Sequence, residues 1–189
     1  MTGVGTVAPL AGGDRELLLN GIRDVPDHPK AGVVFKDITP LLADPRAFSV
    51  LTDALAAAVT RVGATAVAGL EARGFIIGAP AAVRAGVGFV PVRKAGKLPG
   101  ETVGESYSLE YGTAEVELQA DAIGPGDRVL IIDDVLATGG TAGASVRLIR
   151  RTGAEVVGVT VLLELGFLGG RELLLEALDD VPLEALITV

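Results

Sequence analysis

The hydrophobic pattern of the chain alternates between short apolar runs and longer amphipathic segments. Short apolar runs bounded by glycine or charged residues are typical of buried strands, whereas an apolar period near 3.6 residues is typical of helices. This alternation predicts an α/β fold with an open, mostly parallel, twisted sheet flanked by helices. The strand-like runs are residues 65–70, 87–92, 124–133 and 154–165, and the helix-like segments are residues 14–22, 44–59, 74–86 and 141–153.

Local signals mark the ends of several predicted helices. Asp44 and Pro45 suit the N-cap and the first position of a helix that ends near Gly63. Gly153 is expected to stop the helix before it, because glycine readily adopts the left-handed conformation that commonly follows a helix. Pro80 lies close enough to the start of its segment to kink that helix rather than abolish it.

Two segments lack an apolar period. Residues 1–13 are rich in glycine and small residues, and they are expected to form a flexible tail before a single domain at residues 14–189. Residues 93–106 are basic and contain glycine and proline, which predicts a long mobile loop. The alternating segments 107–112 and 114–119 are expected to pair as a hairpin.

Composition excludes several classes of protein. Apolar residues make up 49% of the chain and charged residues 21%, which argues against intrinsic disorder. The net charge of −8 argues against a general nucleic-acid binder, so a phosphate ligand must meet local positive charge, backbone amides or a metal ion. The apolar runs are much shorter than the ~20 residues of a membrane span, and the N-terminus is a poor signal peptide. The absence of cysteine suits a reducing cytosol, so we expect a cytoplasmic protein.

The segment RVLIIDDVLATGGTAGAS carries the strongest chemical signal. In open α/β sheets, ligands bind beyond the carboxyl ends of the strands, and the run VLIIDD places Asp133 and Asp134 at such an end. The glycines that follow permit a tight turn into a helix whose first amides can bind a phosphate, with help from the hydroxyls of Thr138 and Thr141. The segment matches neither GxxxxGK[ST] nor GxGxxG.

Two carboxylates beside a phosphate would repel it unless they hold something between them. A sugar diol is one candidate, because carboxylates accept hydrogen bonds from hydroxyls, and a hydrated Mg²⁺ is another. Ribose 5-phosphate suits both parts of the segment, because its phosphate can bind at the helix start and its 2′- and 3′-hydroxyls can reach the two aspartates. The structural alternative is that Asp133 and Asp134 simply cap the end of a strand.

The same segment closely resembles the phosphoribosyl pyrophosphate motif of the type I phosphoribosyltransferases. That resemblance implies a ribose 5-phosphate site formed by Asp133, Asp134, Ala137, Thr138, Gly139, Gly140 and Thr141. Four further segments resemble the adenine-specific members of that family: GVVFKDITPLL (32–42), GLEARGFIIGAPAA (69–82), residues 90–119 and LLELGFLGGRELL (162–174).

The resemblance has consequences for fold and activity. It implies a small N-terminal base-binding hood at about residues 14–42 and a mobile hairpin loop at about residues 94–112. The implied reaction is purine salvage, in which adenine and phosphoribosyl pyrophosphate give AMP and pyrophosphate with Mg²⁺ as cofactor. A homodimer is also implied, while the net charge and the short apolar runs predict no nucleic-acid or membrane partner.

For the base, the resemblance implies stacking on Phe35 and reading of the purine edge by the backbone of Val34 and Lys36. A backbone carbonyl accepts from the 6-amino group and an amide donates to N1, so a 6-oxo purine would leave buried groups unpaired. Ordinary core packing is the alternative for Phe35. Glu110 is implied as the acid/base that handles the proton on N7 of the purine.

For pyrophosphate, the resemblance implies Arg73, which follows a non-proline cis peptide before Ala72, and the loop cations Arg93, Lys94 and Lys97. The alternatives are a surface arginine and a solvated loop. The chain departs from the family pattern at Ala31 and Ala95, where proline is frequent, and at Lys36, where some members have arginine.

Three other functions stay open from the sequence. The first is a phosphoribosyltransferase for another purine, such as xanthine or guanine. The second is a non-catalytic regulator that binds phosphoribosyl pyrophosphate, although the chain is short and acidic for that class. The third is a doubly wound domain with an unrelated ligand, which requires the motif to be accidental.

Overall fold

The structure is a computed structural model that describes residues 10–108 and 112–189. Its main sheet has the strand order β5-β6-β4-β3-β7-β8-β9. Strands β4, β3, β7, β8 and β9 run parallel, and β5 and β6 form an antiparallel hairpin at one edge. The strands are β3 (Ala66–Leu70), β4 (Gly88–Lys94), β5 (Thr102–Ser108), β6 (Thr113–Gln119), β7 (Arg128–Leu136), β8 (Glu155–Glu164) and β9 (Leu183–Thr188).

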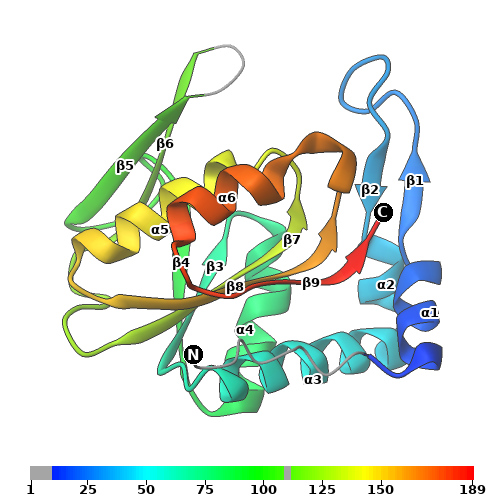
Figure 1. Cartoon of the computed structure of the whole chain (residues 1–189), viewed down its shortest axis with the longest axis horizontal. Helices are drawn as coiled ribbons and strands as arrows, with labels where there is room; N and C mark the ends of the chain where they lie inside the picture. The colour runs from blue at the N-terminus through cyan, green and yellow to red at the C-terminus, as the bar shows by residue number, and fades with distance from the viewer. Residues whose placement is uncertain (1–9, 109–111) are drawn as a thin grey trace.

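Helices cover both faces of this sheet, and a separate core lies on each side (Figure 1). The helices α3 (Pro45–Arg61) and α4 (Arg73–Ala85) pack on one face, where residues such as Leu55 and Ile77 are fully buried. The helices α5 (Gly140–Arg151) and α6 (Gly170–Leu178) pack on the other face, and the 3₁₀ turn η1 (Gly166–Leu168) precedes α6. The prediction of an open, mostly parallel sheet flanked by helices is therefore confirmed.

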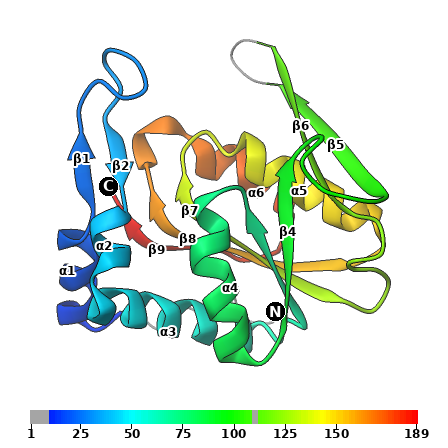
Figure 2. The same cartoon turned by 180° about the vertical axis from the view of Figure 1, so that it is seen from behind.

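A second, smaller unit stands beside the main sheet. It consists of α1 (Gly12–Asn20), the antiparallel pair β1 (Arg23–Val25) and β2 (Phe35–Asp37), and α2 (Thr39–Ala43); we call it the hood. Figures 1 and 2 show the β1–β2 hairpin of the hood and the β5–β6 hairpin projecting toward the same side of the molecule, with the turn between β7 and α5 lying between them.

The order of the strands creates a switch point between β3 and β7. The chain leaves β3 through α4 to reach β4 on one side, and it leaves β7 through α5 to reach β8 on the other. Pairing between β3 and β7 ends at Gly69 and Ile132, so Asp133 and Asp134 lie just where the two strands part. A crevice at such a point is the usual ligand site of an open α/β sheet.

Several local predictions are confirmed by the structure. The Asp44 carboxylate accepts hydrogen bonds from the amides of Arg46 and Ala47 at 2.8 and 3.1 Å, as an N-cap should, and α3 begins at Pro45. Gly153, with φ +86°, follows the end of α5. The peptide bond between Glu71 and Ala72 is cis, as the family resemblance implied.

Other predicted boundaries are wrong. The first helix spans Gly12–Asn20, two residues ahead of the segment predicted at 14–22. Strand β7 continues to Leu136, because Val135 and Leu136 pair with Leu163 and Glu164 of β8, so the two aspartates lie within the strand rather than at its end. Residues beyond Leu165 form η1, α6 and β9, which the hydrophobic pattern did not indicate.

The segment predicted as a long mobile loop is also largely regular. Residues 93–94 belong to β4, and residues 102–106 belong to β5, which pairs with β6 along its length. The Glu105 side chain of β5 is bound by Arg147 and Arg151 of α5 at 2.8 and 3.0 Å, so tertiary contacts and not an apolar period create this strand. The predicted hairpin pairing is confirmed at Tyr107, opposite Ala114.

No helix in residues 10–108 and 112–189 combines the length and the apolar character that crossing a membrane requires.

Candidate active site

The turn between β7 and α5, which we call the cradle, has the geometry of an anion-binding turn. Gly139 adopts φ +81°, a left-handed conformation that favours glycine, and α5 begins at the next residue, Gly140. No side chain among the described residues caps this helix. Its first amides therefore point outward without a side-chain partner, at the positive end of the helix dipole, where an anion is stabilised.

The backbone at the start of α6 packs directly against the backbone of the cradle. A Cβ atom at Gly139 would lie 2.6 Å from the Gly170 carbonyl oxygen, and one at Gly170 would overlap the Ala137 carbonyl oxygen. The two backbones are thus in direct contact, which only glycine allows. Arg171 fixes this arrangement through two ion-pair contacts to Glu164 of β8, at 2.8 and 2.5 Å. Gly170 was not among the site residues predicted from the sequence.

The two threonines of the cradle differ in their surroundings. Thr138 is exposed, whereas Thr141 is half-buried. The Thr141 hydroxyl lies 3.1 Å from the hydroxyl of Tyr107, which extends from β5 toward the cradle. Tyr107 therefore connects the β5–β6 hairpin to the start of α5. This contact could not be predicted from the sequence, because it joins residues 34 positions apart.

The two aspartates face different surroundings. Asp134 is buried, at 4% exposure, and its Oδ2 atom accepts no hydrogen bond from the described residues. Asp133 accepts a hydrogen bond from the Asp134 amide at 2.9 Å. Burial and the neighbouring charge of Asp134 raise the pKa of Asp133 well above its usual value, and burial raises the pKa of Asp134 despite the opposing effect of Arg73. Such a pair is suited to hold a polar ligand rather than to cap a strand.

Arg73 links the acid pair to the hood. Its Nε atom lies 2.8 Å from Asp134 Oδ2, an ion pair whose atoms are not aligned for a hydrogen bond. Its guanidinium carbon lies 4.6 Å from the centroid of the Phe35 ring, and its NH1 group donates to the Lys36 carbonyl at 3.4 Å. Arg73 is therefore not the surface arginine that the sequence left as an alternative.

The hood contacts Arg73 through the Phe35 ring and the Lys36 backbone carbonyl. Phe35 is half-buried and lies outside both hydrophobic cores; it contacts Arg73, and its ring centroid is 5.0 Å from that of His28 in an edge arrangement. The Lys36 side chain lies 2.7 Å from Asp24 of β1, and its backbone carbonyl accepts from Arg73. Val34, just before β2, is exposed.

The predicted loop cations gather around Glu71, at the end of β3. Arg93 Nε and Lys97 Nζ lie 3.1 and 2.6 Å from the Glu71 carboxylate, which also accepts from the Lys94 amide at 3.1 Å. Burial tends to raise the pKa of Glu71, but the hydrogen bonds from Lys97, the Lys94 amide and Arg93 outweigh it and lower the pKa. The Lys94 side chain is exposed. Because Glu71 and Arg73 flank Ala72, this cluster lies at the same sheet edge as the acid pair.

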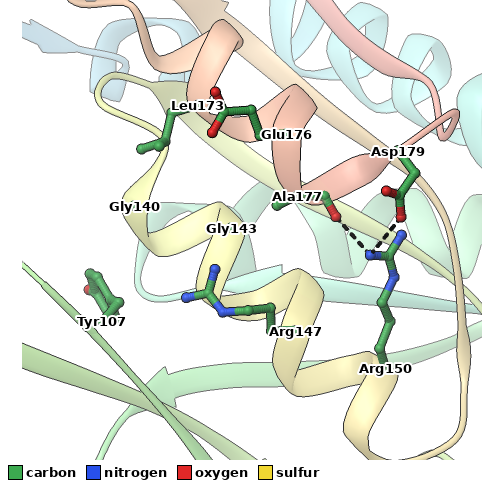
Figure 3. Close-up of a pocket in the computed structure, with 10 residues that line it drawn as sticks. Tyr107, Gly140, Gly143, Arg147, Arg150, Leu173, Glu176, Ala177 and Asp179 are labelled. Atoms are coloured by element: carbon green, nitrogen blue, oxygen red, sulfur yellow. Dashed lines mark hydrogen bonds and ion pairs between the residues drawn. The ribbon is translucent and has the colours of Figure 1, made fainter.

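A cavity of about 520 Å³ lies between α5, α6 and Tyr107 (Figure 3). It touches the cradle at Gly139 and Gly140 but contains none of Asp133, Asp134 or Phe35. Its arginines are already paired, Arg147 with Glu105 and Arg150 with Asp179 and the Ala177 carbonyl. The cavity therefore borders the glycine turn, whereas the acid pair and Phe35 lie outside it.

The structure thus brings most of the predicted site residues to one edge of the sheet. Phe35, Lys36, Arg73 and Asp134 form one contact network, with Asp133 and the cradle residues directly beside it. Arg93 and Lys97 form a neighbouring cluster through Glu71, whose role the sequence analysis missed. Glu110 lies outside the described residues.

Comparison with known proteins gives consistent results. A model of the phosphoribosyl transferase domain matches residues 41–171. An adenine phosphoribosyltransferase of Streptomyces coelicolor is 69% identical over 177 residues, which cover 94% of this chain and 97% of that protein. A crystal structure of adenine phosphoribosyltransferase from Rhodothermus marinus has a TM-score of 0.89 and 49% identity, covering 95% of this chain and 100% of the other. The Giardia lamblia enzyme complexed with 9-deazaadenine has a TM-score of 0.84 and 38% identity, covering 94% and 97%.

Proposed function

The chain belongs to the adenine phosphoribosyltransferases of the phosphoribosyltransferase family, and we propose that its crevice beside Asp134 carries out their reaction. The enzyme transfers the 5-phosphoribosyl group from phosphoribosyl pyrophosphate to N9 of adenine, giving AMP and pyrophosphate in purine salvage. One observation supports this assignment of residues: Arg73 contacts Phe35 and Lys36 on one side and Asp134 on the other. The aromatic ring proposed to stack on the base therefore lies close to the acid pair proposed to bind the sugar.

The cradle and the acid pair are assigned to ribose 5-phosphate. The amides after Ala137 and the hydroxyls of Thr138 and Thr141 hold the 5′-phosphate, which the uncapped start of α5 supports. The carboxylates of Asp133 and Asp134 accept hydrogen bonds from the ribose 2′- and 3′-hydroxyls. The Oδ2 atom of Asp134 supports this role, since it is buried and, among the described residues, has an ion-pair contact with Arg73 but no aligned hydrogen-bond donor, so a ligand hydroxyl can supply one.

The Phe35 ring is assigned to the face of the purine, and the backbone of Val34 and Lys36 to its edge. Arg73 already donates an N–H to the Lys36 carbonyl, which supports the orientation of this oxygen toward the space over Phe35. A carbonyl acceptor at this point favours a 6-amino purine over a 6-oxo purine.

In the reaction, N9 attacks C1′ of the ribose while the bond from C1′ to the pyrophosphate oxygen breaks and its electron pair leaves with pyrophosphate. The sugar acquires oxocarbenium character, which the carboxylates of Asp133 and Asp134 stabilise electrostatically. Arg73 and the loop cations Arg93, Lys94 and Lys97 neutralise the leaving group. The role of Glu110 in removing the purine proton stays a prediction, carried by the family resemblance alone.

Mg²⁺ is proposed as the cofactor, held through substrate and water. The described residues contain no group of three or more aspartate, glutamate or histidine side chains arranged for a metal. Mg²⁺ suits such a site, because it commonly keeps several waters and binds mainly through substrate phosphates, and the carboxylates of Asp133 and Asp134 would accept hydrogen bonds from those waters. When bound, the ion neutralises charge that develops on pyrophosphate.

A panel of bases tests the proposed function. Purified protein is mixed with phosphoribosyl pyrophosphate, Mg²⁺ and adenine, hypoxanthine, guanine or xanthine, and nucleotide is measured by chromatography. We expect AMP from adenine, with kcat/KM about 10- to 100-fold above that of each 6-oxo purine, because a mismatched edge leaves buried polar groups unpaired. Faster turnover of a 6-oxo purine, or no nucleotide from any base, would refute the proposed function.

We further propose that the enzyme is a homodimer that uses the outer face of α4. This face carries the exposed side chains of Ile76 and Val83, one on each half of the helix, while its inner face packs in the core. Val83 is 80% exposed in the single chain, which is unusual for an apolar side chain on a regular helix.

Replacing Val83 by glutamate is expected to convert the dimer to monomer, because it buries a charge at the proposed interface. Light scattering coupled to gel filtration should give a mass near 19.2 kDa for the variant and about twice that for wild type. Leu175→Glu on α6, across the sheet, is the matched control and should stay dimeric. A dimeric Val83→Glu would exclude this face.

The cytoplasm is proposed as the compartment. The chain carries no cysteine, which suits a reducing environment, and its substrates are metabolites rather than membrane components.

A further inference from the structure

Arg73 lies across the space that the base is proposed to enter. Three contacts hold its guanidinium there: the Phe35 ring at 4.6 Å, the Lys36 carbonyl at 3.4 Å and Asp134 Oδ2 at 2.8 Å. The side chain is about a third exposed, at 31%, so it is held by these contacts and not enclosed by the core.

Two of these contacts are the ones assigned to adenine. A guanidinium is flat and stacks on an aromatic face, as a purine does, and its N–H donates to a carbonyl, as a 6-amino group does. One face of the Phe35 ring cannot hold the guanidinium and a purine at the same time. A purine that stacks on the face of Phe35 covered by Arg73 must therefore displace the guanidinium, which then loses its contact with the ring.

The third contact connects the base slot to the other substrate. Asp134 is the carboxylate assigned to the ribose hydroxyls, and it holds Arg73 by charge in the absence of sugar. When phosphoribosyl pyrophosphate binds, its hydroxyls engage Asp134, and its pyrophosphate offers the guanidinium a stronger anionic partner. Both changes favour withdrawal of Arg73 from Phe35.

We propose that Arg73 is an internal occupant of the base slot, which blocks purine binding until phosphoribosyl pyrophosphate draws the guanidinium away. This inference rests on the proposed function, because it uses the substrates assigned there. It gives Arg73 a second role, as the residue that couples the two substrate sites. Its consequence is measurable: the affinity for a base depends on the other substrate, and Arg73 carries that dependence.

The test is a binding cycle with 9-deazaadenine, which carries carbon in place of N9 and so cannot form the glycosidic bond of AMP. Its dissociation constant is measured by calorimetry with and without Mg²⁺ and saturating phosphoribosyl pyrophosphate. For wild type we expect about tenfold tighter binding when phosphoribosyl pyrophosphate is present. For Arg73→Ala we expect the free protein to bind the analogue about fivefold more tightly than free wild type, because no guanidinium must be displaced, and the coupling to fall below about threefold.

Arg84→Ala is the matched control, since it removes the same charge from the far end of α4, where Arg84 pairs with the exposed Asp53. It should keep the wild-type affinities and coupling. Equal binding of 9-deazaadenine to wild type with and without phosphoribosyl pyrophosphate would overturn the inference, as would an unchanged affinity in free Arg73→Ala.

Crystals of wild type provide a measurement that does not depend on the folding of a variant. The guanidinium should lie over Phe35 without ligand and contact pyrophosphate oxygens after a soak with Mg²⁺ and phosphoribosyl pyrophosphate. A guanidinium that stays on Phe35 in the soaked crystal would overturn the inference. If wild type forms AMP but shows no coupling, only this inference fails; if it forms no AMP, the proposed function fails as well.

Discussion

Replacing Asp134 by asparagine is expected to lower kcat about 100- to 1,000-fold, the range found when one electrostatic contact to a transition state is removed. The amide keeps the size of the carboxylate and can still accept from a ribose hydroxyl, but it lacks the negative charge that stabilises a cationic sugar. The loss should appear in kcat and not only in KM, because the charge on the sugar develops in the transition state. Steady-state formation of AMP at saturating substrates measures it.

The same variant should not be destabilised at neutral pH. The pKa of Asp134 is raised in the folded protein, so the folded state binds the proton more tightly than the unfolded state. The stability that this proton contributes is present at acid pH and is lost as the pH rises through the folded pKa. Asparagine does not titrate, so we expect the Tm of Asp134→Asn at pH 7.5 to equal or exceed that of wild type. The difference in Tm between the variant and wild type should shrink toward pH 4, where protonation of Asp134 stabilises wild type.

Asp53→Asn is the control for this change, since Asp53 forms an exposed ion pair with Arg84 on the surface. It should keep wild-type kcat and Tm. Wild-type turnover in Asp134→Asn would exclude the role assigned to the acid pair. A large fall in its Tm at pH 7.5 would mean that the carboxylate is a structural anchor for Arg73.

Local chemistry explains which parts of the fold could be predicted from the sequence. The start of α3 follows from Asp44 and Pro45, whose capping and backbone preferences act within one turn. Strands buried on both faces, such as β3 and β8, follow from continuous apolar runs. Strand β5 has no such run: Glu105 is held by two arginines of α5, and the pattern of residues 102–108 contains no sign of those partners.

The same distinction holds for the site. The aspartate pair and the glycine turn are contiguous, so their chemistry could be inferred from one segment. The contact of Arg73 with Phe35 joins residues 38 positions apart, and Glu71 meets Arg93 and Lys97 only because β3 and β4 are neighbours. These contacts depend on where the hood lies and on the order of strands in the main sheet, both of which the hydrophobic pattern leaves undetermined.

Gly170 illustrates a positioning residue that only the packing reveals. A methyl group at this position would overlap the Ala137 carbonyl oxygen and press on the Gly139 amide, so the cradle backbone must move to accommodate it. Arg171, tied to Glu164, resists movement of α6 in the other direction. The displacement therefore falls on the loop that binds the 5′-phosphate.

For Gly170→Ala we expect KM for phosphoribosyl pyrophosphate to rise about 100-fold, because a shift of about 1 Å in a positioning element has effects of that size. Overpacking should also lower the Tm by about 5 °C, given a cost of about 1–3 kcal/mol. Gly143→Ala is the matched control: it lies in α5, where an added Cβ comes no closer than 3.7 Å to a neighbour, so it should keep the wild-type KM and fold at least as stably. Initial rates with phosphoribosyl pyrophosphate varied at saturating adenine, together with thermal melts, make the comparison. A wild-type KM in Gly170→Ala would mean that the cradle at Ala137 and Gly139 does not bind the 5′-phosphate.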